Sequence, residues 1–219
     1  MLPGDNPAVT TPETSTHSRW SLLARVVAVS VLLNGCAGEG PSPPPASSPA
    51  VDPSPAVEGR AAVGAVVTLE PTTGATPLPA GPAIMDQISK TFIPEMLVVR
   101  VGQRVEFRNS EDQDHNVAVI RSPAGTAIFS TSTPSFQKYE HTFDRAGRYE
   151  VSCDVHPGMR ATIFATTAPY SVVVDTSRRF KFANLSRGSY RLALLNGAAP
   201  LERTIEVGGT AVDVGTLAQ

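Results

Sequence analysis

The stretch GRYEVSCDVHPGMRATIFA, residues 147–165, decides the fold and points to the chemistry of the site. Its first seven residues alternate, and they place Tyr149, Val151 and Cys153 on one face of an expected β-strand. RATIFA, residues 160–165, reads as a further strand. Because Cys153 shares its face with two apolar residues, its sulfur is expected to point into a core. Between the strands, CDVHPGM brings a thiol, an imidazole and a thioether close together.

The rest of the chain has the composition of an all-β protein. Its 219 residues include 17 Gly and 20 Pro, with abundant Val and Thr, and short alternating runs are separated by turn residues. Such runs are MLVVRVGQRVEFRNS (96–110), HNVAVI (115–120) and, from Tyr170 onward, YSVVVD, RRFKFANL, GSYRLALL and RTIEVGG. We therefore expect β-sandwiches rather than helix bundles. The formal net charge of -2 would not attract nucleic acid, so we expect no nucleic-acid partner.

An apolar stretch near the N-terminus ends in a cysteine. VVAVSVLLNGC, residues 26–36, follows Arg25 and is too short to span a bilayer, which needs roughly 20 apolar residues. Its LLNGC end resembles a bacterial lipoprotein box, which implies cleavage before Cys36 and lipidation of that residue. The alternative is a plain signal peptide cut elsewhere, and the long leader leaves open a true start downstream of Met1. We expect residues 1–36 to be a signal peptide with this box.

The expected lipid anchor predicts the location of the protein. Through lipidated Cys36 the mature chain would be held to a membrane and would face the periplasm within the cell envelope, at the outer membrane if the bacterium is Gram-negative. Residues 37–58, AGEGPSPPPASSPAVDPSPAVE, offer almost nothing to bury, so they are expected to form a disordered, extended linker.

A second imidazole completes the candidate metal site. His115, in DHNVAV, lies on a separate expected strand that enters the same core. Together with Cys153, His156 and Met159 it forms a set that fits trigonal thiolate and imidazole ligation with a weak axial thioether, the arrangement of blue copper. Zinc fits less well, because a thioether contributes little to zinc binding. The plain alternative is a buried cysteine and methionine that only fill the core.

The stretch from Met85 to Ile163 resembles a cupredoxin, most closely an amicyanin-like one. The residues that carry the resemblance are FIPEMLVVRVGQRVEF, HNV, HTFDRAGRYEVSC and HPGMRATI, including the short C-x2-H-x2-M loop. The resemblance implies a Greek-key β-sandwich and a one-electron carrier with a single copper ion cycling between Cu(I) and Cu(II). It also implies the ligands: His115, Cys153 and His156 would be equatorial and Met159 axial.

Further roles follow from the same resemblance. Asn116, beside the first ligand, would tie the two ligand-bearing segments together. His156, flanked by Pro157, would lie near the surface where a redox partner docks through a small, weak interface. Amicyanins carry proline before this histidine, whereas this chain has Val155. We predict that the backbone N–H of Val155 donates to the Cys153 sulfur and raises the reduction potential.

A second fold is indicated downstream. FKFANLSRGSY, residues 180–190, resembles the F-x-F-x-x-L-x-x-G-x-Y stretch of transthyretin-like, carboxypeptidase-regulatory-type sandwiches, and GAVVTL, residues 64–69, matches the first strand of that family. We therefore expect a nested arrangement, with the first strand of this small sandwich within 59–80, the cupredoxin domain at 82–167 and the remainder of the sandwich at 168–219. The alternative is two consecutive domains.

Three classes of function remain to be compared. The first is an electron carrier, and the second is a copper-handling protein that buffers or delivers the metal. The third, a self-contained oxidase or nitrite reductase, needs histidines for further coppers. After His115 and His156 the mature chain has only His141, which we expect to be a solvated surface residue, so no enzyme is expected. A rigid site with a buried thiolate favours the carrier, because metal delivery favours exposed, easily exchanged ligands.

Overall fold

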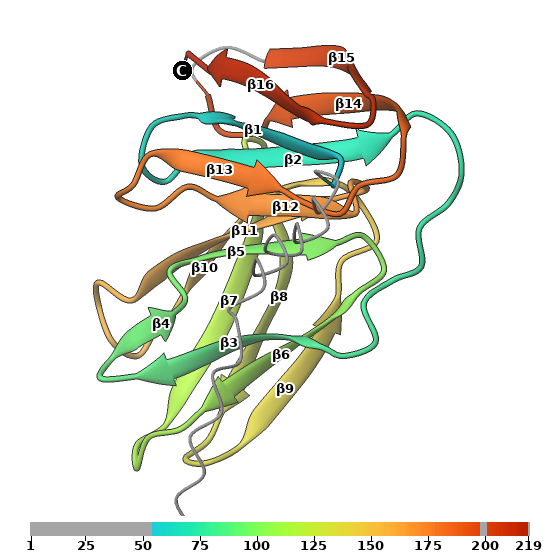
Figure 1. Cartoon of the computed structure of the whole chain (residues 1–219). Helices are drawn as coiled ribbons and strands as arrows, with labels where there is room; N and C mark the ends of the chain where they lie inside the picture. The colour runs from blue at the N-terminus through green and yellow to red at the C-terminus, as the bar shows by residue number, and fades with distance from the viewer. Residues whose placement is uncertain (1–53, 198–200, 219) are drawn as a thin grey trace, which may run out of the picture. The chain divides into compact units, whose positions relative to one another are not determined.

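The computed structural model describes residues 54–197 and 201–218, and every regular element in these ranges is a strand (Figure 1). The expected all-β fold is therefore confirmed. The expected signal peptide at residues 1–36, including Cys36, and most of the expected linker lie outside the described residues. No helix in the described ranges is long and apolar enough to cross a membrane.

Nine consecutive strands form a first sandwich, called the N sandwich, over residues 83–166. One of its sheets has the order β5 (Met96–Arg100), β11 (Arg160–Thr166), β10 (Gly147–Ser152), β7 (His115–Ser122) and β8 (Thr126–Thr133). The other has the order β4 (Thr91–Ile93), β3 (Ala83–Ile88), β6 (Arg104–Asn109) and β9 (Lys138–Thr142). Alternating residues of both sheets enclose one core, which includes Phe107, Val117, Val151 and Ile163.

Seven strands from both ends of the described chain form a second sandwich, called the C sandwich. One sheet has the order β13 (Arg179–Phe182), β1 (Ala56–Arg60) and β16 (Ala211–Thr216). The other has the order β12 (Tyr170–Val173), β2 (Val66–Pro71), β14 (Gly188–Leu194) and β15 (Leu201–Val207). Strand β2 is antiparallel to both β12 and β14, with Leu69 opposite Tyr170 and Leu192. Strands that precede and follow the N sandwich in the chain thus share a sheet.

Strand β1 departs from the expected organisation. It begins at Ala56, inside the segment 37–58 that was expected to be linker, and it precedes the strand placed first from the sequence. Ala56 and Val57 are buried, and Val57 lies opposite Phe182 on one side and Val212 on the other. The local sequence is rich in proline and serine, so only partners far along the chain make this strand stable.

Gly59 shows how closely β1 is packed. The register between β1 and β16 shifts between Glu58 and Arg60, and a Cβ at Gly59 would lie 2.8 Å from the Gly215 oxygen, the Phe180 ring and the Val214 side chain. Only glycine fits this approach of strand to strand.

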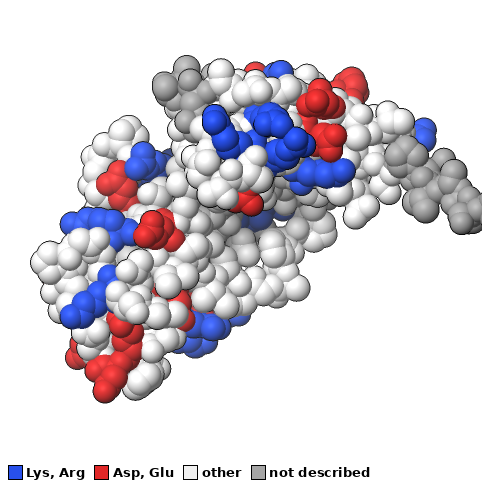
Figure 2. Space-filling view, turned by 60° about the vertical axis from the view of Figure 1, so that its left-hand side comes forward, with Lys and Arg blue, Asp and Glu red and all other residues white. Residues whose placement is uncertain are grey.

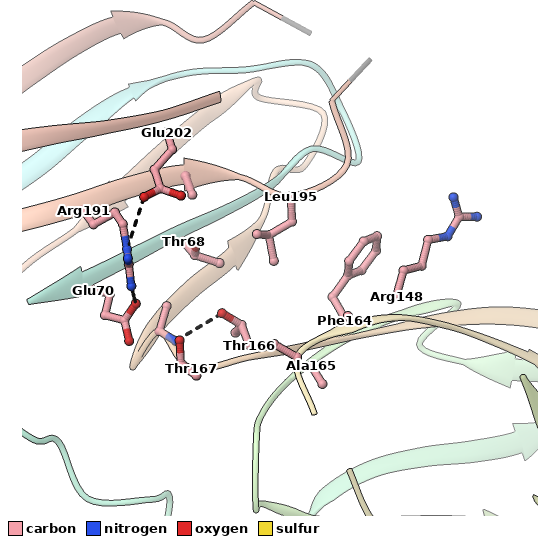
Figure 3. A pocket seen from close by; sticks show the side chains of 14 residues that line it. Thr68, Glu70, Arg148, Phe164, Ala165, Thr166, Thr167, Arg191, Leu195 and Glu202 are labelled. Atoms are coloured by element: carbon pink, nitrogen blue, oxygen red, sulfur yellow. Dashed lines mark hydrogen bonds and ion pairs between the residues drawn. The ribbon is translucent and has the colours of Figure 1, made fainter. Parts of the chain in front are cut away.

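Charged side chains of both signs are interspersed on the face seen in Figure 2. In the C sandwich, Arg191 of β14 forms ion pairs with Glu70 of β2 and with Glu202 of β15, the latter at 3.6 Å from Nε to Oε1 (Figure 3). No histidine or cysteine is among the described residues that line the pocket drawn in Figure 3.

Candidate metal centre

Three donor atoms converge at one end of the N sandwich. The Cys153 sulfur lies 3.8 Å from Nδ1 of His115 and 4.0 Å from Nδ1 of His156, and the two Nδ1 atoms are 2.9 Å apart. Within the described ranges, this is the one group of at least three His, Cys, Asp or Glu side chains whose donor atoms all lie within 4.8 Å of one another. His115 and Cys153, which are 38 residues apart, are thus brought together by the fold.

Strand geometry places these side chains. His115 is the first residue of β7 and only 1 % exposed, and Cys153 directly follows β10 and is 2 % exposed. Val119 and Val151 lie opposite each other where β7 pairs with β10, so both donors emerge from the same end of adjacent strands. Inward alternation along β10 continues from Tyr149 through Val151 to Cys153, as the sequence pattern indicates.

The loop from Cys153 to Met159 closes the hairpin between β10 and β11. The Cys153 N–H donates to the Met159 carbonyl at 3.3 Å, and the Met159 N–H donates to the His156 carbonyl at 3.4 Å. Gly158 has φ of +94°, a backbone conformation that favours glycine. Met159 is 2 % exposed and belongs to the same buried cluster as Cys153, whereas His156 is partly exposed. The loop therefore carries Cys153 and Met159 inward and His156 to the rim.

Glu111 is a functional candidate that sequence reasoning missed. Its Oε2 lies 2.6 Å from Nε2 of His115, so an ionised carboxylate accepts a hydrogen bond from the Nε2–H and leaves the lone pair of Nδ1 free. Burial opposes the ionised form of Glu111, but hydrogen bonds from the Lys90 N–H and from His115 outweigh it and lower the pKa of Glu111. The available signal was the acidic run SEDQD before His115, which has no regular spacing to show which acid turns inward.

Asn116 connects the two segments that supply the donors. Its Nδ2 donates to Oδ2 of Asp154 at 2.7 Å, and its Oδ1 accepts the Asp154 N–H at 2.5 Å. Asp154 follows Cys153 directly, so both hydrogen bonds fix the start of the loop relative to β7. Such a connection holds donor atoms in place when the metal changes charge.

Val155 does not make the hydrogen bond expected from the sequence. Within the described residues, the polar neighbours of the Cys153 sulfur are the two histidine nitrogens, and no hydrogen bond joins it to the Val155 N–H. The Val155 side chain is 55 % exposed, and Pro157 is exposed as well. The hydrogen bonds that fix the start of the loop are those at the neighbouring Asp154, and the influence of Val155 on the reduction potential stays a prediction.

His141 lies apart from the donor cluster and is half-buried rather than fully solvated. Its ring packs between Phe129 and Phe143, with centroid distances of 4.5 and 4.9 Å. Burial lowers the pKa of His141, partly opposed by the charge of Asp144. This histidine serves packing on β9.

The donor atoms are spaced to share one metal ion, and the set of thiolate, imidazole and thioether favours copper. At the bond lengths found at zinc sites, about 2.0 Å to nitrogen and about 2.3 Å to sulfur, bonds roughly 120° apart place nitrogen and sulfur about 3.7 Å from each other. The sulfur–nitrogen distances of 3.8 and 4.0 Å meet this requirement. The two nitrogens, at 2.9 Å, would separate by about half an ångström to share one ion. The pKa of His156 lies below its usual range because of desolvation and the adjacent His115, which favours the neutral ring that binds metal.

Comparisons with known proteins agree with this chemistry. Residues 84–166 match the family model of copper binding proteins, plastocyanin/azurin family. Residues 84–166 form a cupredoxin domain. Amicyanin from Paracoccus versutus is 29% identical over 98 residues, which are 44% of this chain and 74% of that protein. Amicyanin from Paracoccus denitrificans is 29% identical over 106 residues, 48% of this chain and 81% of that protein.

A solved structure is also similar in part. The Cu-containing nitrite reductase (NirK) from Thermus scotoductus SA-01 aligns with 25% identity and a TM-score of 0.37, over 44% of this chain and 25% of that one. The cupredoxin assignment rests on the family match and the amicyanins. It gives copper as the cofactor, and at the level of the family it gives electron carriage as the function.

Proposed function

We propose that this chain is a one-electron carrier of the bacterial cell envelope, with one copper ion held by His115, Cys153, His156 and Met159. The observation that carries the proposal is the convergence of the Cys153 sulfur with two histidine Nδ1 atoms inside a β-sandwich. Bound copper would supply one-electron redox chemistry. Met159 would complete the set from the end of the same loop, as a weak axial ligand.

The surroundings of the donors favour electron carriage over metal delivery. Cys153 and His115 are almost completely buried, and the segments bearing them are joined through Asn116 and Asp154. Donors that are buried and held in place suit both charge states with little rearrangement. A delivery protein would instead benefit from exposed ligands that exchange readily.

His156 provides the route to a partner. Its ring is partly exposed, whereas the other donors lie inside, and its neighbours in the chain, Val155, Pro157 and Gly158, are exposed. These side chains are small and uncharged, so a redox partner can approach the imidazole closely. We propose that this rim forms a small, transient docking interface of the kind found in electron-transfer complexes.

The position in the cell envelope and the domain organisation are part of the same proposal. The expected signal peptide and lipidated Cys36 would anchor the chain to a membrane on its periplasmic side. The pairing of β2 with β12 and β14 supports a cupredoxin domain nested within a transthyretin-like sandwich. We assign the C sandwich a supporting or docking role.

Reconstitution with one equivalent of Cu(II) tests the proposal. We expect intense blue absorption, a reversible one-electron couple and copper that stays bound through repeated cycles in the presence of a chelator. A stable but colourless Cu(II) complex would overturn the proposed ligation of copper by the Cys153 thiolate. A blue complex that surrenders Cu(I) to an acceptor protein faster than it exchanges electrons would favour copper handling.

A further inference from the structure

A buried polar network lies behind His115, on the side away from the donor cluster. Five polar residues in this region are inaccessible or nearly so, which is unusual in the core of a small sandwich. They are Gln87, Glu106, Asn109, His115 and Thr133. Four of these belong to the network, which also includes the partly exposed Glu111, whereas Glu106 pairs with Arg108 and Lys138.

The first part of the network is a ring that returns to His115. Glu111 accepts from the His115 side chain, and the Glu111 N–H donates to Oδ1 of Asn109 at 3.0 Å. The Asn109 amide donates to the Thr133 carbonyl at 2.8 Å. Thr133 of β8 lies directly opposite His115 of β7 in the strand pairing. The position of the imidazole is thus fixed through its carboxylate partner and through its cross-strand neighbour.

Gln87 fixes this ring from outside. It lies on β3 in the opposite sheet, is 0 % exposed, and its Nε2 donates to Oγ1 of Thr133 at 3.0 Å and to the Arg108 carbonyl at 3.1 Å. The reverse orientation of the amide would bring its oxygen against the Arg108 carbonyl, two acceptors facing each other. The two donated hydrogen bonds therefore set the orientation of the side chain.

The same side chain leaves one polar atom without a partner. Oε1 of Gln87 is buried and accepts no hydrogen bond within the described residues. An apolar side chain of similar shape would fill the space without burying an unpaired oxygen, so packing alone does not account for glutamine here. What glutamine adds is a rigid link from one sheet to the strand opposite the metal ligand.

We propose that Gln87 is a positioning residue for the copper centre, acting through Thr133 on His115. Its side-chain hydrogen bonds go to Arg108 and Thr133, and none joins it to the donor cluster within the described residues. By tying Thr133 of β8 to β3 in the opposite sheet, it limits how far the His115 ring can turn or withdraw when the charge at the site changes. The inference rests on the proposed function, because the placement of His115 matters only if this imidazole is a ligand.

The variant Gln87→Met tests the proposal, because methionine approximates the shape of glutamine and donates no hydrogen bond. In the metal-free protein, we expect the Nε2 proton of His115 to exchange with solvent roughly five- to tenfold faster. Exchange requires a local opening of the structure, and the loss of one net hydrogen bond makes that opening more favourable by about this factor. In the Cu(II) protein we expect an altered copper hyperfine splitting and a shifted reduction potential. The matched control is Met85→Leu, also on β3 and 0 % exposed, which should change neither.

A second variant keeps the test decisive if Gln87→Met does not fold. Thr133→Val removes only the acceptor of the Gln87 hydrogen bond and should reproduce the faster exchange, and in a double variant the two effects should not add. Unchanged exchange and unchanged hyperfine splitting in a folded variant would overturn the proposal. If the wild-type protein forms no blue complex, the proposed function fails, but the exchange rate in the metal-free protein still decides whether Gln87 positions His115.

Discussion

Strands β10 and β14 have the same pattern of buried residues, but the residue at the third buried position differs in kind. GRYEVSC, residues 147–153, and GSYRLAL, residues 188–194, each begin with glycine and bury a tyrosine two residues later. Each tyrosine hydroxyl donates to a carbonyl four residues earlier, from Tyr149 to Arg145 at 2.8 Å and from Tyr190 to Ser186 at 3.0 Å. At the third inward position β10 leads into Cys153, whereas β14 ends in Leu194. The same strand framework thus supports either a donor atom or a packed side chain.

The two cores also differ in the polar groups they enclose. The buried polar residues of the N sandwich include Gln87, Asn109, His115 and Thr133, whereas among the described residues of the C sandwich Thr68 alone is of this kind. An apolar core gains stability from every side chain. A core that holds a metal centre must also fix the direction of its ligands, which requires hydrogen bonds in its interior.

The largest expected effect comes from substituting the third inward residue of each strand, Cys153 after β10 and Leu194 in β14. Cys153→Ser should abolish the blue absorption of the Cu(II) protein while keeping the metal-free fold. Leu194→Ala should lower the free energy of unfolding by about 2–5 kcal/mol, because it opens a cavity in the C sandwich, and should keep the blue colour. Visible spectra and urea unfolding check both variants. A blue Cys153→Ser protein would contradict the comparison.

A smaller effect is expected at the carboxylate behind His115. Glu111→Gln should weaken copper binding by roughly tenfold or more, because an amide holds the imidazole less firmly than a carboxylate does. Competition with a chelator of known affinity measures this loss. Glu70→Gln, which alters the partner of Arg191 in the C sandwich, is the matched control and should leave the affinity unchanged.

The two tyrosines sharpen the comparison further. Tyr149→Phe and Tyr190→Phe should each lower the free energy of unfolding by about 1 kcal/mol, the net value of one hydrogen bond. Urea unfolding of the metal-free variants measures both values. Neither substitution should change the copper spectrum. A spectral change in Tyr149→Phe would show that the hydrogen bond of Tyr149 also affects the geometry of the copper site at the end of β10.

The smallest expected effect concerns acid. Hydrogen bonds from Lys138 and Arg108 lower the pKa of Glu106 from 4.5, so the folded chain binds this proton less tightly than the unfolded chain. The resulting stabilisation is complete above pH 4.5 and is lost as the pH falls through the lower folded pKa. Glu106→Gln should therefore flatten the loss of stability on acidification, measured by unfolding on either side of that pH. If the stability of the variant falls equally steeply with acidification, other titrating groups cause the loss of stability.

Local pattern predicts some parts of this molecule well and others poorly. Alternation in GRYEVSC correctly turns Cys153 inward, and β14 follows from the same rule, whereas β2 is buried at four successive residues and is indicated by a short apolar run that ends in a turn. Strand β1 could not be predicted, because its apolar residues are few and its partners, such as Phe182 and Val212, are far along the chain. Glu111 was missed for a related reason: in an irregular acidic loop, only the tertiary fold determines which carboxylate reaches His115.

The pairing of β2 with β12 has a consequence for biosynthesis. Leu69 of β2 can pair with Tyr170 of β12, and Ala56 of β1 with Ala211 of β16, only after the later strand of each pair has been synthesised. At roughly 5–20 residues per second, synthesis of the intervening chain takes seconds, while a single domain commonly folds faster. The N sandwich can therefore mature first, as a folded body that shortens the effective gap between the waiting strands. A lesion that slows its folding would leave β1 and β2 as unpaired edges, open to association with other chains.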